Sequence, residues 1–119
     1  MAINKGVNVL QFSFTYADTS SFLIGYLPPN AYVTDIKLII TTDFTDGVLD
    51  VGTSANAASF VNDASLNGID VQTVTPVTGS WGVIQSAANQ TAINGIVVAT
   101  STGLAAGAAK VTVEYVFEE

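Results

Sequence analysis

The sequence of 119 residues contains no cysteine, no histidine and no arginine. Without cysteine or histidine the chain can form neither disulfides nor thiolate or imidazole metal sites, and it cannot build a Ser-His-Asp or Cys-His nucleophile system. Without arginine it lacks the side chain that most often reads guanine bases. We therefore expect no enzyme, no catalytic residue, no metal and no cofactor.

Positive charge is scarce as well. The only cations are Lys5, Lys37 and Lys110, against ten carboxylates, so the net charge is -7. Proteins that bind nucleic acids or anionic membranes need basic surfaces, and we expect neither kind of partner. The sequence has no apolar run near the ~18 residues of a membrane span and no pattern of a signal peptide, which predicts synthesis in a cytoplasm.

Hydrophobic residues, in contrast, make up 49% of the chain, and only 11% of the residues are charged. Valine, isoleucine and threonine together supply 38 residues. These branched side chains suit a pleated sheet and lose rotamer freedom in a helix. The length fits one core. The composition therefore predicts one all-β domain spanning residues 1–119.

Three segments alternate between apolar and polar residues with a period of two, which predicts half-buried strands. Their predicted inner faces carry large apolar side chains. These are Leu10, Phe12, Phe14 and Tyr16; Ile36, Leu38 and Ile40; and Val111, Val113, Tyr115 and Phe117. Ile39 breaks the second pattern, so part of that strand is expected to be covered on both sides.

Weaker strand signals and turn residues fill the rest of the chain. Further strands are expected at 21–26, 48–51, 69–75, 81–85 and 92–100, separated by turns such as Asp46-Gly47 and Asn67-Gly68. The alanine-rich stretch Ser54–Asn62 is expected to be a short helix or a loop. The overall prediction is a β-sandwich of about eight short antiparallel strands, jelly-roll or Greek-key like, with at most one short helix.

The carboxylates offer two further hypotheses. Asp43, Asp46 and Asp50 are close enough in sequence to hold a divalent cation, but they lack the register of an EF-hand loop. Asx-turns in a hairpin loop are the favoured interpretation. A glycosidase acid–base pair drawn from Asp50, Asp63, Asp70 or Glu114 is disfavoured, because nothing in the sequence raises the pKa of one of them.

Exposed aromatic residues are the candidates for a contact surface. Tyr26 and Tyr32 flank the turn at Pro28-Pro29, and Trp81 is the only tryptophan. Trp81 fits a binding hot spot and a core position equally well. We predict a partner interface formed by Tyr26, Pro28, Pro29, Tyr32 and Trp81.

The stretch 27–63, about a third of the chain, resembles small β-sandwich structural proteins of tailed bacteriophages, found as capsid decoration (cement) or other virion components. The resemblance rests on a Leu-Pro-x-Asn-Ala turn at 27–31, a Val-x-Asp-Ile strand at 33–36 and the motif Leu-Asp-Val-Gly-Thr-Ser at 49–54. The family has no catalytic residues to carry over.

This resemblance implies a non-enzymatic protein on the capsid exterior. Such a protein binds the major capsid protein and stabilises contacts between shell subunits, commonly as a homotrimer or another homo-oligomer. A carbohydrate- or receptor-binding module of a phage tail fibre is the alternative, with Trp81 and Tyr32 as an aromatic platform and Ca²⁺ near Asp43 and Asp46.

Overall fold

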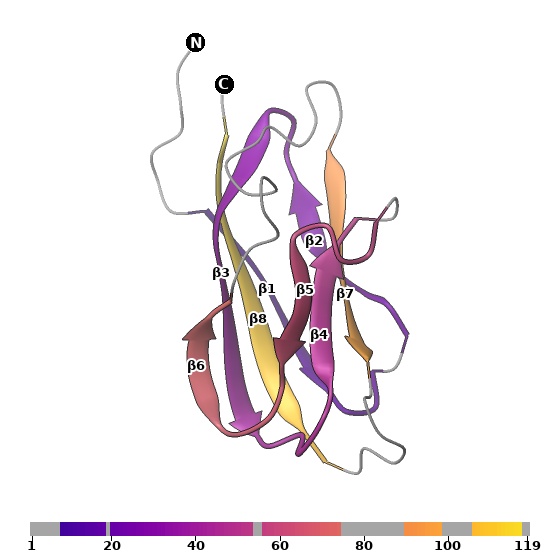
Figure 1. Cartoon of the computed structure of the whole chain (residues 1–119). Helices are drawn as coiled ribbons and strands as arrows, with labels where there is room; N and C mark the ends of the chain where they lie inside the picture. The colour runs from indigo at the N-terminus through magenta and orange to yellow at the C-terminus, as the bar shows by residue number, and fades with distance from the viewer. Residues whose placement is uncertain (1–7, 19, 54–55, 75–89, 99–105, 118–119) are drawn as a thin grey trace.

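Eight antiparallel strands form two four-stranded sheets in the computed structural model (Figure 1). The structure describes residues 8–18, 20–53, 56–74, 90–98 and 106–117. The strands are β1 (Asn8–Thr15), β2 (Phe22–Leu27), β3 (Ala31–Thr42), β4 (Val48–Gly52), β5 (Val61–Ser65), β6 (Asp70–Thr73), β7 (Thr91–Val98) and β8 (Ala108–Phe117). The described residues include no helix, and thus none that could cross a membrane.

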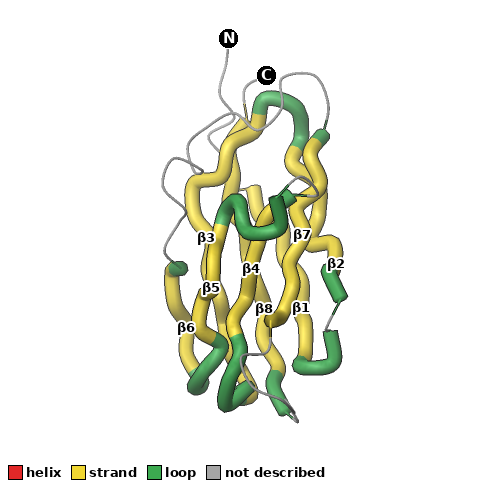
Figure 2. Tube along the Cα trace, turned by 45° about the vertical axis from the view of Figure 1, so that its right-hand side comes forward, coloured by secondary structure: helices red, strands yellow, loops and turns green. Residues whose placement is uncertain are grey.

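The strand order identifies the topology. One sheet has the order β1-β8-β3-β6 and the other β2-β7-β4-β5. The first strand therefore pairs with the last, the second with the seventh, the third with the sixth and the fourth with the fifth. This is the pairing of a long hairpin rolled into two facing sheets, a jelly roll (Figures 1 and 2). The predicted all-β sandwich is confirmed; the strand expected at 81–85 lies outside the described residues.

The three alternating segments form strands with the expected inner faces. In β3, Ile36, Leu38 and Ile40 are buried, and in β8 Val111 and Val113 are fully buried. The inner face of β1 ends at Phe14, because the chain turns at Tyr16 and leaves that side chain exposed. Ile39 is half-buried on the outer face, where it lies between Lys110 of β8 and Val71 of β6.

Strand β3 contains two bulges that adjust its register to β8. The register shifts between Val33 and Asp35 and again between Ile40 and Thr42. The residue at each shift is a threonine whose hydroxyl donates a hydrogen bond to a carbonyl of β8: Thr34 to Glu114 and Thr41 to Ala108. These side chains tie the extra residues to the neighbouring strand.

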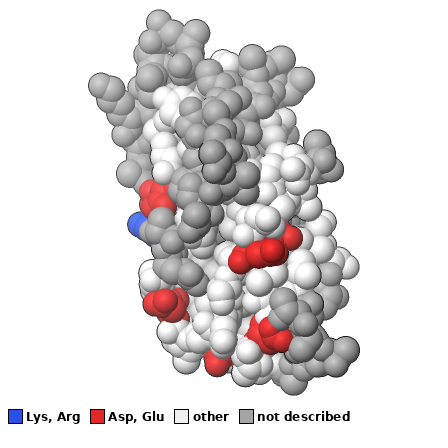
Figure 3. Space-filling view, viewed as in Figure 1, with Lys and Arg blue, Asp and Glu red and all other residues white. Residues whose placement is uncertain are grey.

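Charged side chains lie at the surface (Figure 3). Among the described residues no polar or charged residue is buried, while twenty-one hydrophobic residues are. A charge taken into such an interior without a partner would be strongly disfavoured. Among the described residues, the packing between the sheets is therefore made by apolar side chains.

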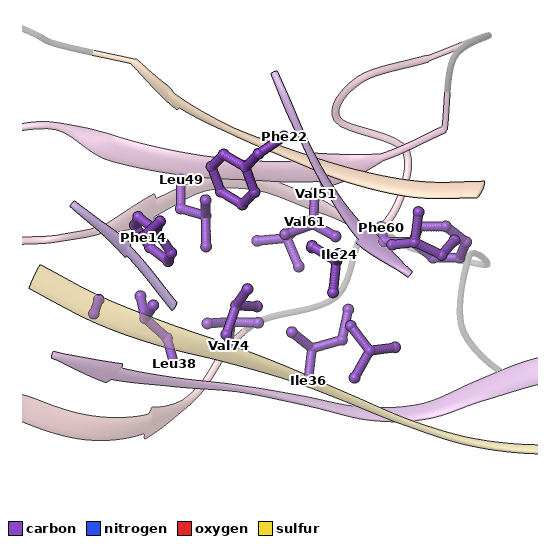
Figure 4. Close-up of a cluster of buried hydrophobic side chains, with 14 of the residues drawn as sticks. Phe14, Phe22, Ile24, Ile36, Leu38, Leu49, Val51, Phe60, Val61 and Val74 are labelled. Atoms are coloured by element: carbon purple, nitrogen blue, oxygen red, sulfur yellow. The ribbon is translucent and has the colours of Figure 1, made fainter. Parts of the chain in front are cut away.

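Aromatic rings join the two sheets along the side formed by β1 and β2; Phe14 and Phe22 are labelled in Figure 4. Phe22 of β2 stacks on Phe12 and Phe14 of β1, with centroid distances of 4.7 and 5.2 Å. Phe14 in turn lies 5.9 Å from Phe44, which belongs to the loop after β3. Such ring pairs add to the free energy gained by burial, and here they link both sheets and a loop.

The stretch Ser54–Asn62 contains no helix in its described part. Residues 56–60 form turns, and β5 begins at Val61. The Asn56 carbonyl accepts hydrogen bonds from the N–H groups of Thr53 and Ser59, and its side chain accepts one from Ala58. Local bonds of this kind compete with helical ones, and burial of Phe60 and Val61 draws the chain back into the sheet.

The motif residues at the turns have conformational roles. Asn30, after Pro28-Pro29, has a φ of 62°, which asparagine tolerates better than most residues. Gly52 ends β4 under the turn that follows, and a Cβ there would meet the backbone of Asn56 and Ala57. The positive φ of Asn30 and the lack of space at Gly52 give physical reasons for the Leu-Pro-x-Asn-Ala and Leu-Asp-Val-Gly-Thr-Ser patterns.

A buried ring in the β3–β4 loop holds the lower end of the sandwich. Phe44 is completely buried and covers Gly107, the residue before β8. Gly107 has a φ of 144°, which L side chains rarely adopt, and a Cβ at this position would collide with the Phe44 ring. Thr45 follows Phe44 with a φ of 63°, an unusual value for a branched residue. Burial of Phe44 thus holds two residues, Thr45 and Gly107, in backbone conformations with a positive φ that cost free energy.

Asp43 ties this loop to the β5–β6 turn. Its Oδ1 accepts the N–H groups of Gly68 and Thr45, with N–O distances of 2.8 and 2.7 Å. The Leu66 N–H also donates to the Gly47 carbonyl across the same two loops. The hydrogen bond from Gly68, and then that from Thr45, lowers the pKa of Asp43 below its ordinary value of 3.8, because both favour the ionised carboxylate.

Replacing Gly107 by alanine should destabilise the fold by at least about 2 kcal/mol, because it adds backbone strain and a collision with a buried ring. Gly68→Ala is the matched control, since Gly68 also has a positive φ of 92° but no atom within 4 Å of the added Cβ. It should cost about 1 kcal/mol. Urea unfolding measures both; equal losses would contradict the role of the Phe44 contact.

Asp43→Asn should lower the melting temperature at neutral pH. A lowered pKa in the folded state means that ionised Asp43 stabilises the fold above its ordinary pKa, and that this stabilisation is lost as the pH falls through the folded-state value. The difference from wild type should therefore be present at pH 7 and vanish in acid. Asp18→Asn removes a carboxylate that, among the described residues, accepts the N–H of Thr15 alone, and serves as the control. A difference that is constant with pH would contradict this assignment.

Candidate functional site

The acidic cluster proposed from the sequence consists of carboxylates that bond to the backbone. Asp43 accepts two N–H groups, as described above. Asp46 Oδ1 accepts the N–H of Gly47 at 2.7 Å, and Asp50 Oδ1 accepts the N–H of Asp63 at 2.8 Å. In the described residues there is no group of three potential ligands placed to hold a metal ion. Only the bond from Thr45 to Asp43 has the two-residue spacing of an Asx-turn, whereas Asp50 bonds across to β5.

The four carboxylates considered as an acid–base pair are distributed over both sheets. Asp50 and Asp63 are on β4 and β5, whereas Glu114 is on β8 of the other sheet. Asp70 lies on the edge strand β6, where its Oδ1 accepts the N–H of Val71. The bonds to Asp50, Asp70 and Asp43 are all turn or edge contacts, and none of these groups lies in the apolar interior.

The two described lysines share one surface. Lys37 of β3 and Lys110 of β8 both point away from the core on the outer face of the β1-β8-β3-β6 sheet. Lys37 Nζ lies 3.6 Å from Asp35 and 3.9 Å from Glu114, so its charge is balanced on the same face. Exposed pairs of this kind contribute little to stability.

A shallow groove of about 200 Å³ opens beside Lys110. Most of the side chains that line the groove are small. The Thr41 hydroxyl at its side donates a hydrogen bond to the Ala108 carbonyl. The residues that line it are Ser13, Phe14, Thr15, Thr41, Ala108, Ala109 and Lys110. The lining contains no carboxylate to act with the lysine as an acid–base pair.

The structure separates the aromatic residues expected to form one contact surface. Tyr26 is 48% exposed on β2, whereas Tyr32 is half-buried on β3, in the opposite sheet. The turn at Pro28 and Pro29 crosses between the sheets, with Pro29 exposed and Pro28 half-buried. Trp81 lies outside the described residues. Tyr26 and Tyr32 therefore face opposite sides of the sandwich.

Two exposed apolar side chains on the same outer face as Tyr26 were missed by the sequence analysis. Leu23 of β2 and Val98 of β7 are 42% and 39% exposed on the same outer face as Tyr26. The alternation Phe22-Leu23-Ile24 was a possible signal, since one of three consecutive apolar residues in a strand must point outward. Only the pairing of β2 with β7 shows that these side chains share a surface.

Comparisons with known proteins give structural matches only. No family model matches the chain, and neither does any curated protein sequence. A chain in the capsid asymmetric unit of cyanophage Pam1 matches with a TM-score of 0.71 and 20% identity, covering 94% of this chain and 85% of that one.

Two further phage capsids contain similar chains. One from the capsid of Ralstonia phage GP4 has a TM-score of 0.69 and 17% identity, with 97% of this chain and 86% of that chain covered. One from the acid-stable capsid of Helicobacter pylori bacteriophage KHP30 has a TM-score of 0.62 and 13% identity, with 95% and 89% covered. The chain thus has the fold of chains found in phage capsids, which agrees with the resemblance drawn from residues 27–63.

Proposed function

We propose that this chain is a non-enzymatic structural protein of a phage virion, and more narrowly a decoration or cement protein that binds the outside of the capsid shell. The observation that carries the proposal is the jelly roll shared with phage-capsid chains over 94–97% of its length. The fold alone does not specify a function. The surface chemistry of the chain supports the narrower role.

That chemistry suits contact rather than catalysis. The described carboxylates of the acidic cluster serve the backbone, and the groove at Lys110 lacks an acid–base partner. Tyrosine and aliphatic side chains are exposed on a sheet face. A net charge of -7 disfavours an inner surface that faces packaged DNA and suits the capsid exterior.

The partners follow from this role. The chain would be synthesised in the host cytoplasm and would bind the major capsid protein across the seams between its subunits. Self-association as a homotrimer or another homo-oligomer would repeat one modest contact several times and raise the overall affinity. Tyr26, Pro28, Pro29, Tyr32 and Trp81 remain the proposed contact residues; the separation of Tyr26 and Tyr32 assigns them to two different contacts.

The tail-fibre alternative has less support. Its calcium site would need Asp43 and Asp46, whose Oδ1 atoms accept backbone N–H groups. Its aromatic platform would pair Tyr32 with Trp81, which the structure does not describe.

Purified chain mixed with undecorated shells of its own phage should co-sediment with them to saturation. The shells should also withstand higher temperatures, because each bound copy adds contacts that must break before the shell opens. Shells that already carry the protein are the control and should take up no more. Absence of both binding and stabilisation would refute the decoration role, and binding on a glycan array would favour the tail-fibre alternative.

A further inference from the structure

The outer face of the β2-β7-β4-β5 sheet carries a row of partly exposed apolar side chains, which shares the face with Asn94 and Asp50. We call it the apolar face and define it by Leu23, Tyr26, Val48, Ile96 and Val98. The strand register gives their positions. Val48 of β4 lies opposite Val98 of β7. Leu23 of β2 lies opposite Asn94 of β7, and the next side chain of β7 on the same face is Ile96. Leu23, Tyr26 and Val98 are each 39–48% exposed.

The outer face of the other sheet is different. We call it the polar face and define it by Gln11, Lys37, Lys110, Thr112 and Glu114. Lys37, Thr112 and Gln11 are directly paired across three strands, and the neighbouring outward position on β8 is Glu114. The polar face thus has its own ion pairs. Exposed apolar side chains, Val9 and Val71, also lie on this side of the sheet, so the two faces differ in charge and not in apolar content.

Charge also distinguishes the two faces. Both described lysines belong to the polar face, and no lysine lies among the described residues of β2, β4, β5 and β7. Asp50 of β4 lies opposite Ile96 of the apolar face, and the backbone of Asp63 lies beside the Asp50 carboxylate. In Figure 3 acidic groups are spread over the visible side, and the basic atoms in view lie at its left margin. The apolar face is therefore bordered by negative charge without compensating cations from its own strands.

We propose that the apolar face is the surface that docks onto the capsid shell, on a shell-protein patch with an apolar centre and lysine or arginine side chains at its border. The inference rests on the proposed decoration function. The composition fits the core of a protein interface, which is depleted of charge and enriched in aromatic residues. The unbalanced carboxylates select a basic partner, because complementary charge guides association and like charge opposes it.

A second copy of this chain is a poorer occupant of the same face. A two-fold contact would bring Asp50 and Asp63 of one copy against the same carboxylates of the other, or leave them beside an acidic surface. Self-association of the chain would therefore use other surfaces and leave the apolar face free for the shell.

Leu23→Lys tests the docking surface, with Val9→Lys as its matched control. Val9 is 44% exposed and Leu23 42%, on edge strands of opposite sheets, so the two changes add the same charge at equally exposed positions. We expect Leu23→Lys to weaken binding to undecorated shells about tenfold or more, since it would place a charge in the apolar contact. Val9→Lys should bind as wild type does.

Asp50→Asn tests the charge at the border without adding bulk. The asparagine Oδ1 can still accept the N–H of Asp63, so the β4–β5 contact is retained while the charge is removed. Binding should weaken several-fold at low salt, and the difference should shrink at high salt. Glu114→Gln makes the same change in net charge on the polar face and should leave binding unchanged.

The outcomes separate this inference from the function on which it rests. If wild-type chain does not bind shells, both are refuted. If wild type binds and Leu23→Lys and Asp50→Asn bind equally well, the docking surface is wrong while the decoration function stands. If Leu23→Lys instead lowers the mass of an oligomer in light scattering, the apolar face contacts a second copy, which also overturns the inference. Melting temperatures near that of wild type show that the variants are folded.

Discussion

The contact between the inner faces of the two sheets determines where everything else in this molecule can lie. In the described part of the chain no polar or charged residue is buried. An ionised group in this interior would lose its hydration without gaining a partner. All the described carboxylates and lysines are therefore confined to turns, edges and outer faces. Whatever this molecule recognises, it recognises with the outside of its sheets and loops.

The same constraint explains which strands could be predicted from the sequence. β1, β3 and β8 each have one face in the interior, so their apolar residues alternate over many positions. β5 gave no such pattern, since its only buried residue is Val61, and Asp63 has a φ of 59° that interrupts regular extension. Its strand character comes from pairing with the preceding strand β4, which no alternation within β5 records.

The candidate site was predictable only in its parts. The sequence indicates that Tyr26 and Tyr32 are aromatic residues at a Pro-Pro turn, and both are in strands beside that turn. It does not indicate that the turn crosses from one sheet to the other, because this follows from the pairing of β2 with β7 and of β3 with β8. The apolar face is hidden for the same reason. Its residues come from β2, β4 and β7, and only the sheet order brings them together.

The acidic residues also restrict how partners can attach. The Val74 N–H donates to the Ile36 carbonyl of β3. Along an antiparallel strand successive N–H groups point to alternate sides, so the Val71 N–H points toward the free edge of β6. There the N–H is bonded to the carboxylate of Asp70, which deprives an incoming strand of a donor. On β5, the Asp63 N–H is bonded to Asp50 at a bulge. A short edge strand blocked by its own aspartate discourages extension of the sheet by another chain. Attachment through side chains on a sheet face remains, and among the described residues only the β2-β7-β4-β5 face lacks cations on its own strands to balance its acidic residues.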